Sequence, residues 1–184
     1  METRGRARRW LGLCIAAMAL IPSAAAAAKP ASPVGAKAPA IASSHWINSR
    51  PLGSKDLEGK VVVVEFWTFA CINCMRTIPA MRRLHALLPR DEVAIVGVHS
   101  PETDRERELV HLEDAVRSLD IDYPIAVDND FRLWRGFQNR YWPALYVLDK
   151  HGIVRHVHVG ELHERSAAWD QMLEVIGRLR KEAL

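Results

Sequence analysis

The sequence predicts an α/β fold in which helices pack on a central sheet. Residues 61–67 and 93–98 are two nearly unbroken apolar runs rich in β-branched side chains, which is typical of strands buried on both faces. The segment between them predicts an amphipathic helix of about 15 residues. Its apolar residues recur every three or four positions, at Ile78, Met81, Leu84 and Leu88. A strand, a helix and a strand in this order form a right-handed parallel unit, which is characteristic of layered α/β architectures.

Length and composition indicate one folded domain. The chain has 184 residues, of which 49% are hydrophobic and 26% charged. These values suit a chain with one hydrophobic core and differ from those of disordered chains. We expect this domain to span residues 41–184. Residues 29–40 are rich in proline, alanine and lysine, and they predict a linker without regular structure.

The first 28 residues have the pattern of a secretory signal peptide. Four arginines form a basic start, residues 10–21 are mostly apolar, and the alanines at 24–28 offer processing sites. The apolar stretch is shorter than the roughly 20 residues that a membrane-spanning helix needs. An uncleaved signal anchor that extends through the alanine run is the alternative, and the Arg8-Arg9 pair leaves general and twin-arginine export open. We therefore expect a periplasmic or otherwise extracytoplasmic protein.

Removal of the signal peptide simplifies both the charge and the cysteine content. It takes away four of the 25 cationic and one of the 22 acidic residues, which leaves 21 of each. A nearly neutral chain gives no support for nucleic-acid binding, which needs a cationic surface. Cys14 is lost with the signal peptide, so only Cys71 and Cys74 remain, and in an oxidising compartment that pair can cycle between dithiol and disulfide.

The segment after the second strand predicts an additional helix and an additional strand. Residues 103–106 (Thr-Asp-Arg-Glu) form a capping box that opens an amphipathic helix over residues 109–119. A short strand is expected at 123–127. The acidic residues at 128–130 are expected to cap a short helix around Leu133, in preference to binding a metal.

The remaining sequence predicts a hairpin and a last helix. Residues 144–148 and 153–159 form an antiparallel hairpin around the turn Asp-Lys-His-Gly. The last helix carries Trp169, Leu173, Ile176 and Leu179 on one side. In the first helix, Pro79 is expected to introduce a kink, and Pro89 helps to end it.

A Cys-x-x-Cys pair is consistent with a redox dithiol or with half of a zinc site. Zinc needs two further ligands at suitable spacing, and no second cysteine pair follows the signal peptide. His156 and His158 share one face of a predicted strand, where solvent-facing histidines are the simpler interpretation. The dithiol directly follows a buried strand and opens a helix, which favours the redox interpretation, and we expect no metal or cofactor.

The start of a helix favours the chemistry of disulfide exchange. Unpaired backbone N–H groups and the partial positive charge of the helix dipole stabilise a thiolate at Cys71. The thiolate is the species that attacks a disulfide. Cys74 lies one turn further on and is expected to point inward, where it resolves the mixed disulfide.

The segment 62–79 resembles the active-site segment of thioredoxin. It contains Glu65-Phe66-Trp67, the Cys71-Ile72-Asn73-Cys74 motif and Pro79 five residues after the second cysteine. The segment 139–144 (Asn-Arg-Tyr-Trp-Pro-Ala) resembles the loop in which thioredoxin-fold proteins place a cis-proline beside the dithiol. The extra helix and strand at 103–127 resemble the insertion of the exported TlpA and ResA branch.

The segment 66–74 and the loop Tyr141-Trp142-Pro143 are most similar to the thioredoxin-like domain of DipZ proteins. The resemblance covers residues 35–184. It implies an α/β thioredoxin fold, with a central mixed sheet flanked by helices and a TlpA-type helix-strand insertion.

The resemblance also implies site residues beside the dithiol. Glu65, six residues before Cys71, occupies the place of a buried acid that exchanges protons with the inner cysteine, and burial is expected to raise its pKa toward neutrality. A partly hydrated structural acid is the alternative. Trp67 is expected to pack beneath the dithiol, with an ordinary core aromatic as the alternative, and Pro79 is expected to have a structural role near the site.

The implied substrate site lies around the proline loop. A cis Trp142-Pro143 bond leaves the Trp142 backbone free to pair with an extended substrate segment, and Ile72 and Asn73 between the cysteines are expected to contact the substrate. Trp142 and Ala70 depart from the thioredoxin pattern, so thioredoxin's substrate preferences are not expected to apply.

Three functions remain to be distinguished. The first is an exported thiol:disulfide oxidoreductase that acts on protein thiols as a monomer, as a reductant that receives electrons from a membrane thiol donor. The second is a redox-inactive thioredoxin-fold module that binds partners. The third is a thiol peroxidase, which needs a Pro-x-x-x-[Thr/Ser]-x-x-Cys loop that the residues before Cys71 do not supply.

Overall fold

The strands form one mixed sheet in the order β1-β4-β3-β2-β5-β6. The computed structural model describes Met1 and residues 33–184. Within them the strands are β1 (Trp46–Ile47), β2 (Val61–Trp67), β3 (Val93–His99), β4 (Ile125–Val127), β5 (Ala144–Leu148) and β6 (Val154–Val159). The helices are α1 (Ser54–Leu57), α2 (Ile72–Leu87), α3 (Leu109–Ser118), α4 (Arg132–Gly136), α5 (Ala167–Lys181) and the 3₁₀ helix η1 (Asp104–Arg107).

The central strand β2 explains the unbroken apolar run in the sequence. It pairs in parallel with β3, where Glu65 is the partner of Gly97, and antiparallel with β5, where Glu65 is the partner of Leu145. Every residue of β2 is buried. Because both faces of the strand are covered, side chains at odd and at even positions are apolar, with Glu65 as the exception.

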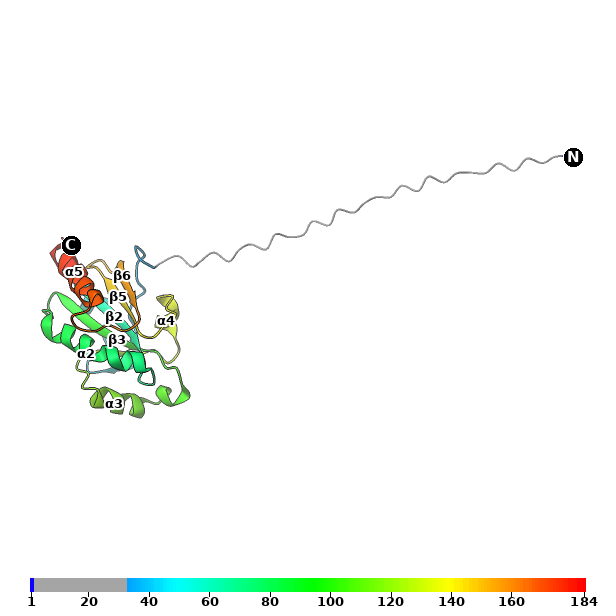
Figure 1. Ribbon diagram of the computed structural model, residues 1–184, viewed down its shortest axis with the longest axis horizontal. Coiled ribbons are helices and arrows are strands. Elements are labelled where there is room, and N and C mark those ends of the chain that lie inside the picture. The colour runs from blue at the N-terminus through cyan, green and yellow to red at the C-terminus, as the bar shows by residue number, and fades with distance from the viewer. Residues whose placement is uncertain (2–32) are drawn as a thin grey trace. The chain divides into compact units, whose positions relative to one another are not determined.

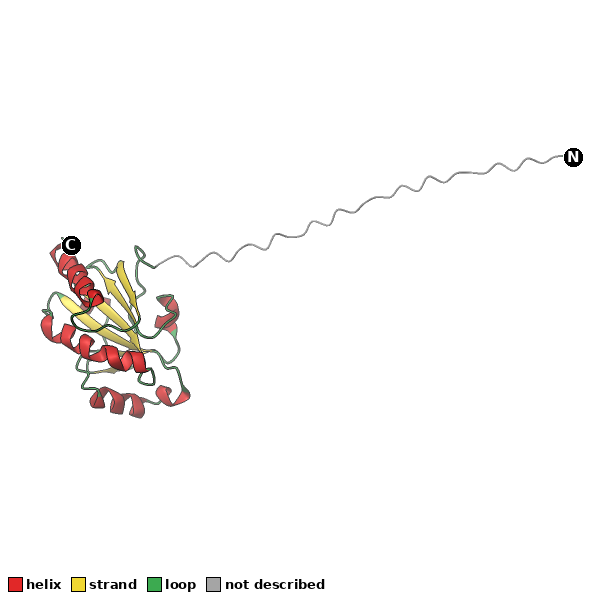
Figure 2. Cartoon of the chain, viewed as in Figure 1, coloured by secondary structure: helices red, strands yellow, loops and turns green. Residues whose placement is uncertain are grey.

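Helices cover both faces of the sheet, as Figures 1 and 2 show. The helices α2, α3 and α5 pack on one face, where their buried side chains share a core with Val61, Val63 and Trp67. Leu133 and Phe137, in and after α4, pack on the other face with Val62 and Val64. The alternation of neighbouring β2 side chains between the two cores follows from the two-residue period of a strand.

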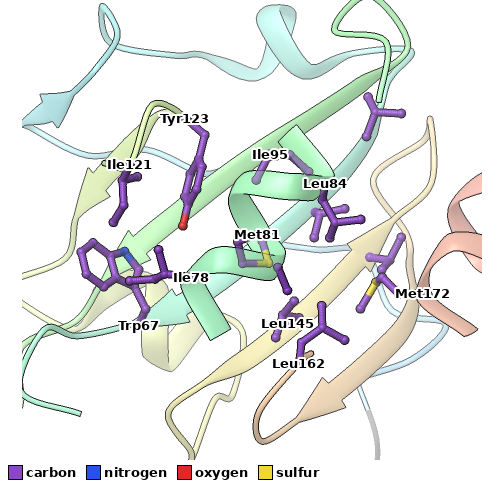
Figure 3. Close-up of a cluster of buried hydrophobic side chains, with 14 of the residues drawn as sticks. Trp67, Ile78, Met81, Leu84, Ile95, Ile121, Tyr123, Leu145, Leu162 and Met172 are labelled. Atoms are coloured by element: carbon purple, nitrogen blue, oxygen red, sulfur yellow. The ribbon is translucent and has the colours of Figure 1, made fainter. Parts of the chain in front are cut away.

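The larger core lies between α2 and the sheet. Figure 3 shows Met81 and Leu84 of α2 above the strands, with Trp67 and Tyr123 toward one end and Met172 of α5 toward the other. All five side chains are fully buried. Burial of each large apolar side chain contributes about 1.5–3 kcal/mol, so this core anchors the helix that follows the dithiol.

Most predicted elements are present with small shifts at their ends. Pro79 lies inside α2, which is one residue longer than expected. The hairpin of β5 and β6 and the last helix are confirmed. The strand expected at 123–127 is shorter than predicted, since β4 covers only Ile125–Val127. Tyr123 precedes the strand, and its side chain packs in the core. The insertion of helix and strand is also present, and it places β4 between β1 and β3.

The predicted capping box at 103–106 caps a different element from the one expected. It opens η1, and α3 begins only at Leu109, with Glu108 at its N-cap. The local pattern identified the turn correctly, but the backbone changes direction again after one short helical turn. The acidic residues at 128–130 behave as predicted, since both carboxylate oxygens of Asp128 accept backbone N–H groups, from Leu133 at 2.8 Å and Trp134 at 2.9 Å.

The second half of the predicted linker is attached to the domain. Gly35 N donates to Val154 O (2.7 Å), Val154 N donates to Ala36 O (2.9 Å), and Ala38 N donates to Gly152 O (2.9 Å). Composition predicted a segment without helix or strand, but it does not reveal that an edge of the sheet offers unpaired backbone groups. The predicted signal peptide, apart from Met1, lies outside the described residues. Within the described part of the chain, no helix has the length and apolar character needed to cross a membrane.

Candidate active site

The two cysteines lie at the first turn of α2. Cys71 is the N-cap residue, with an extended backbone (φ −88°, ψ 113°), and its carbonyl accepts the backbone N–H of Met75 at 3.1 Å. Strand β2 ends at Trp67, so three residues connect the central strand to Cys71. Both cysteines are free thiols. Cys71 therefore stands at the start of a helix, where the sequence places it, and its side chain accepts no capping hydrogen bond from the first turn.

The two thiols differ sharply in exposure. Cys71 is partly exposed, whereas Cys74 is completely buried in the core between α2 and the sheet. Burial raises the pKa of the Cys74 thiol well above its usual range, and hydrogen bonding with Cys71 and the nearby charge of Glu65 raise that pKa further. A disulfide partner can therefore reach Cys71 first, and Cys74 reacts only after losing its proton to a nearby base.

The loop before β5 faces the outer cysteine. The Trp142-Pro143 peptide bond is cis, and the Sγ atom of Cys71 lies 3.8 Å from the carbonyl oxygen of Trp142. The Trp142 indole donates to Ser100 O at 3.1 Å, and its ring packs on Trp134 with ring centroids 4.1 Å apart. These contacts fix the Trp142 backbone next to Cys71.

Glu65 is a buried acid in the middle of the central strand. It is fully buried, and its Oε2 atom accepts the hydroxyl of Tyr123 at 2.9 Å. Its Oε1 atom has no hydrogen-bond partner within the described protein. Burial raises the pKa of Glu65 to about 8, although the bond from Tyr123 opposes this shift. The structure thus provides the burial from which the sequence predicted a raised pKa.

Trp67 is buried in the same core as Cys74, which agrees both with a place beneath the dithiol and with an ordinary core aromatic. Its ring meets the ring of His99 edge to face, with centroids 5.3 Å apart, and Phe69 stacks on the same histidine at 5.6 Å. His99 is fully buried, neither ring nitrogen has a hydrogen-bond partner among the described residues, and burial lowers its pKa to about 4. A neutral aromatic stack therefore supports the loop before Cys71.

The remaining predicted site residues lie on the surface around the dithiol. Ile72 is 61% exposed, Asn73 is also exposed, and the carbonyl of Asn73 accepts the hydroxyl of Thr77 at 3.0 Å. Pro79 lies exposed on α2, two turns beyond Cys71. The structure thus places Ile72 and Asn73 where a docking partner can reach them, and Pro79 further away.

Three residues near the site were missed by sequence reasoning. Tyr123 was assigned to a strand and Glu106 to a helix cap, while His99 was assigned no element, because the second strand was predicted to end at residue 98. Each of them contacts a residue of the dithiol segment 65–71 only because the tertiary fold brings segments that are distant in the chain together. Only the Glu three residues after Thr103 gave a local signal, and that signal concerned the turn rather than the active site. Among the described residues, no group of three or more His, Cys, Asp or Glu side chains is arranged to hold a metal ion.

The sequence that contains this site matches a protein-family model. The model described as "AhpC/TSA family" matches residues 34–157, which is well over half of the chain. The chain belongs to the AhpC/TSA family. This match begins in the segment that pairs with β6 and ends within β6 itself, so it includes the dithiol, Glu65 and the Trp142-Pro143 loop.

This AhpC/TSA-family protein is similar in sequence to two curated bacterial proteins. Protein DipZ of Mycobacterium tuberculosis is 40% identical over 119 residues, which are 63% of this chain and 17% of DipZ. The chain thus spans about a sixth of the length of that relative. Thiol-disulfide oxidoreductase YkuV of Bacillus subtilis is 30% identical over 115 residues, which are 62% of this chain and 77% of YkuV.

A solved structure supports the same assignment. The thioredoxin-like superfamily protein SPOA0173 superimposes with a TM-score of 0.72 at 30% identity, over 80% of this chain and 97% of that protein. The thioredoxin fold and the resemblance to DipZ proteins, both expected from the sequence, are therefore confirmed. The family is one of thioredoxin-like proteins that includes thiol-disulfide oxidoreductases.

Proposed function

We propose that this protein is an exported thiol:disulfide oxidoreductase that acts as a reductant of protein disulfides. The observation that carries the proposal is the asymmetric dithiol: an accessible Cys71 at a helix N-terminus, backed by a buried Cys74 and faced by the Trp142 carbonyl. Disulfide exchange needs one thiol that attacks and a second that releases the partner. The site supplies both.

The reductive cycle begins with attack by the Cys71 thiolate on a partner disulfide. The partner's S–S bond breaks, a mixed disulfide forms between Cys71 and one partner sulfur, and the other partner sulfur leaves as a thiolate that takes up a proton. Cys74 then attacks the Sγ atom of Cys71. The mixed disulfide breaks, the second partner sulfur leaves and takes up a proton, and the Cys71–Cys74 disulfide remains. The partner gains two electrons and two protons in total.

Glu65 accepts the proton that Cys74 must lose before it attacks. A fully buried thiol ionises poorly, so the second step requires a base within the same core. The Glu65 carboxylate is close enough for its charge to raise the pKa of the Cys74 thiol, and its own pKa is about 8. A base with a pKa near the working pH both accepts and returns a proton efficiently.

The partner docks along the Trp142-Pro143 loop. The Trp142 carbonyl faces Cys71, so an extended segment that carries the target cysteine can lie beside this backbone and pair with it. Ile72 and Asn73, the two exposed residues that follow Cys71, contact the same segment. One chain supplies the dithiol, the buried acid and the docking loop, so a monomer is sufficient for this reaction.

The activity is tested by reduction of insulin disulfides with dithiothreitol as the electron source. We expect the wild-type protein to accelerate precipitation of the insulin B chain well above the rate with dithiothreitol alone. A rate equal to that background would favour a redox-inactive binding module. Hydrogen peroxide consumption is expected to be negligible in the same preparation, and saturable peroxide turnover that depends on Cys71 would favour a thiol peroxidase instead.

The direction of electron flow is tested by the reduction potential of the dithiol. Sequence similarity to DipZ and the predicted signal peptide support an exported reductant that receives electrons from a membrane thiol donor. Equilibration with glutathione buffers, followed by mass spectrometry of the alkylated protein, measures the potential. We expect a value well below about −220 mV, whereas a value near −120 mV would indicate an oxidant.

A further inference from the structure

The carboxylate of Glu106 is buried and accepts hydrogen bonds on both sides. Only 1% of the residue is exposed. Its Oε1 atom accepts the hydroxyl of Thr68 and the backbone N–H of Ala70 at 2.8 Å. Its Oε2 atom accepts the backbone N–H groups of Glu102 at 2.9 Å and Thr103 at 2.8 Å, and the Thr103 hydroxyl at 3.1 Å. Five neutral donors thus hold one buried negative charge.

The two sides of this carboxylate bind different parts of the fold. The Oε2 donors belong to the turn that opens η1, where they form the capping box that the sequence predicted. The Oε1 donors belong to the loop between β2 and α2, and Ala70 directly precedes Cys71. Glu106 therefore ties the segment inserted after β3 to the loop that carries the attacking cysteine.

The capping box at Oε2 does not require the hydrogen bonds that Oε1 accepts from the loop. A capping box is complete when the side chain at N3 accepts the N-cap backbone N–H, and such a glutamate usually remains partly exposed. Burying a carboxylate costs several kcal/mol unless its oxygens are well bonded. Placing Glu106 beneath the loop is therefore unfavourable unless the loop donors Thr68 and Ala70 bind it.

We propose that Glu106 is a positioning residue for the dithiol, and that it acts by holding the Thr68–Ala70 loop so that Cys71 stays at the helix start. This inference rests on the proposed disulfide-exchange function. Loss of the bonds on the loop side lets Cys71 move relative to both Cys74 and the Trp142 carbonyl. Small misplacements of a reacting group have large effects on rate, and disulfide formation depends on how closely the two sulfurs are held.

Two matched variants separate this role from helix capping. Thr68→Val and Thr103→Val each remove one hydroxyl that donates to the same carboxylate, the first on the loop side and the second on the η1 side. We expect Thr68→Val to slow insulin reduction about tenfold. We also expect it to raise the midpoint potential of the dithiol by about 30 mV, which corresponds to a tenfold weaker disulfide. Thr103→Val is expected to leave the rate and the potential unchanged and to lower only the melting temperature.

Three further variants keep the test independent of folding. Thr68→Ser retains the hydroxyl and is expected to recover most of the rate. A loss that occurs in Thr68→Val and not in Thr68→Ser is then due to the missing hydroxyl and not to a change in side-chain volume. Glu106→Gln has only one oxygen that can accept, and it is expected to be at least as impaired as Thr68→Val. Glu108→Gln, at an exposed position two residues further on, is the control for removal of a nearby negative charge and is expected to match the wild type.

The outcomes also distinguish this inference from the proposed function. If the wild-type protein does not reduce insulin at all, the proposed function fails first. If the wild type is active and Thr68→Val has the wild-type rate and potential, Glu106 is only a cap of η1 and the positioning role is wrong. Equal losses in Thr68→Val and Thr103→Val would likewise overturn it, because the loop side would then have no special effect.

Discussion

Replacement of Cys74 by serine is expected to abolish insulin turnover and to leave a protein that reacts with a disulfide once and then stops. Cys71 remains partly exposed at the start of α2 and can still attack. The buried sulfur that would release the partner is gone, so the mixed disulfide persists. Serine at position 74 is close in size to cysteine, and we expect the core around Ile78 and Trp67 to remain packed.

The complementary variant is expected to fail at an earlier step. In Cys71→Ser the remaining Cys74 thiol is fully buried and its pKa is raised, so it forms no mixed disulfide at neutral pH. Both variants are best made with Cys14→Ser, so that no third thiol contributes. Non-reducing electrophoresis and intact mass spectrometry after incubation with insulin then report the adduct. Adduct formation by Cys71→Ser, or its absence in Cys74→Ser, would reverse the roles assigned to the two cysteines.

Sequence alone predicts the parts of this site that depend on local pattern. The buried run 61–67, the Cys-x-x-Cys motif and the apolar spacing of the following helix lie within one continuous segment, so strand, dithiol and helix follow directly from it. The position of Glu65 within a strand buried on both faces also predicts a raised pKa, because desolvation depends on burial more than on individual neighbours. The proline loop was placed beside the dithiol by resemblance to thioredoxin.

The contacts that tune and hold the site depend on which strands become neighbours. Insertion of β4 between β1 and β3 brings Tyr123 over Glu65, and the turn after β3 brings Glu106 beneath Ala70. Residues 58 and 36 positions apart in the chain meet in these two bonds, and no local pattern encodes such pairs. Edge pairing of residues 35–38 was missed for the same reason, since a proline-rich composition predicts only the absence of regular structure.

Replacement of Glu65 by glutamine is expected to slow the second step of the cycle about a hundredfold, which is within the range of general acid–base effects. Glutamine has the same shape and can still accept the Tyr123 hydroxyl, but it cannot take the Cys74 proton. The first step, attack by Cys71, is expected to be nearly unchanged. Rapid-quench measurement of mixed-disulfide formation and decay separates the two steps, and equal slowing of both would contradict a specific role in deprotonating Cys74.

The same variant is expected to change how stability depends on pH. The pKa of Glu65 is about 8 in the folded protein, against an ordinary value of 4.5. Between these two pH values the folded protein keeps a proton that the unfolded chain has lost, so the contribution of Glu65 to stability falls as the pH rises. Each unit of difference corresponds to about 1.36 kcal/mol. We therefore expect Glu65→Gln to gain stability over the wild type progressively from pH 5 to about pH 8, by several kcal/mol in total.

Other buried groups titrate in the same experiment but cancel in the comparison. The pKa of His99 is lowered to about 4 by burial, so its contribution rises with pH up to its ordinary value of 6.5 in both proteins. Tyr123→Phe provides the matched control, because loss of the hydroxyl removes the bond that lowers the pKa of Glu65. We expect this variant to shift the contribution of Glu65 to the stability profile and to the pH dependence of Cys74 attack to higher pH, whereas Glu65→Gln removes that contribution from both. If urea denaturation gave parallel profiles for the wild type and Glu65→Gln between pH 5 and pH 8, the pKa of Glu65 in the folded state would be ordinary, and its carboxylate would be too weak a base to take the thiol proton efficiently.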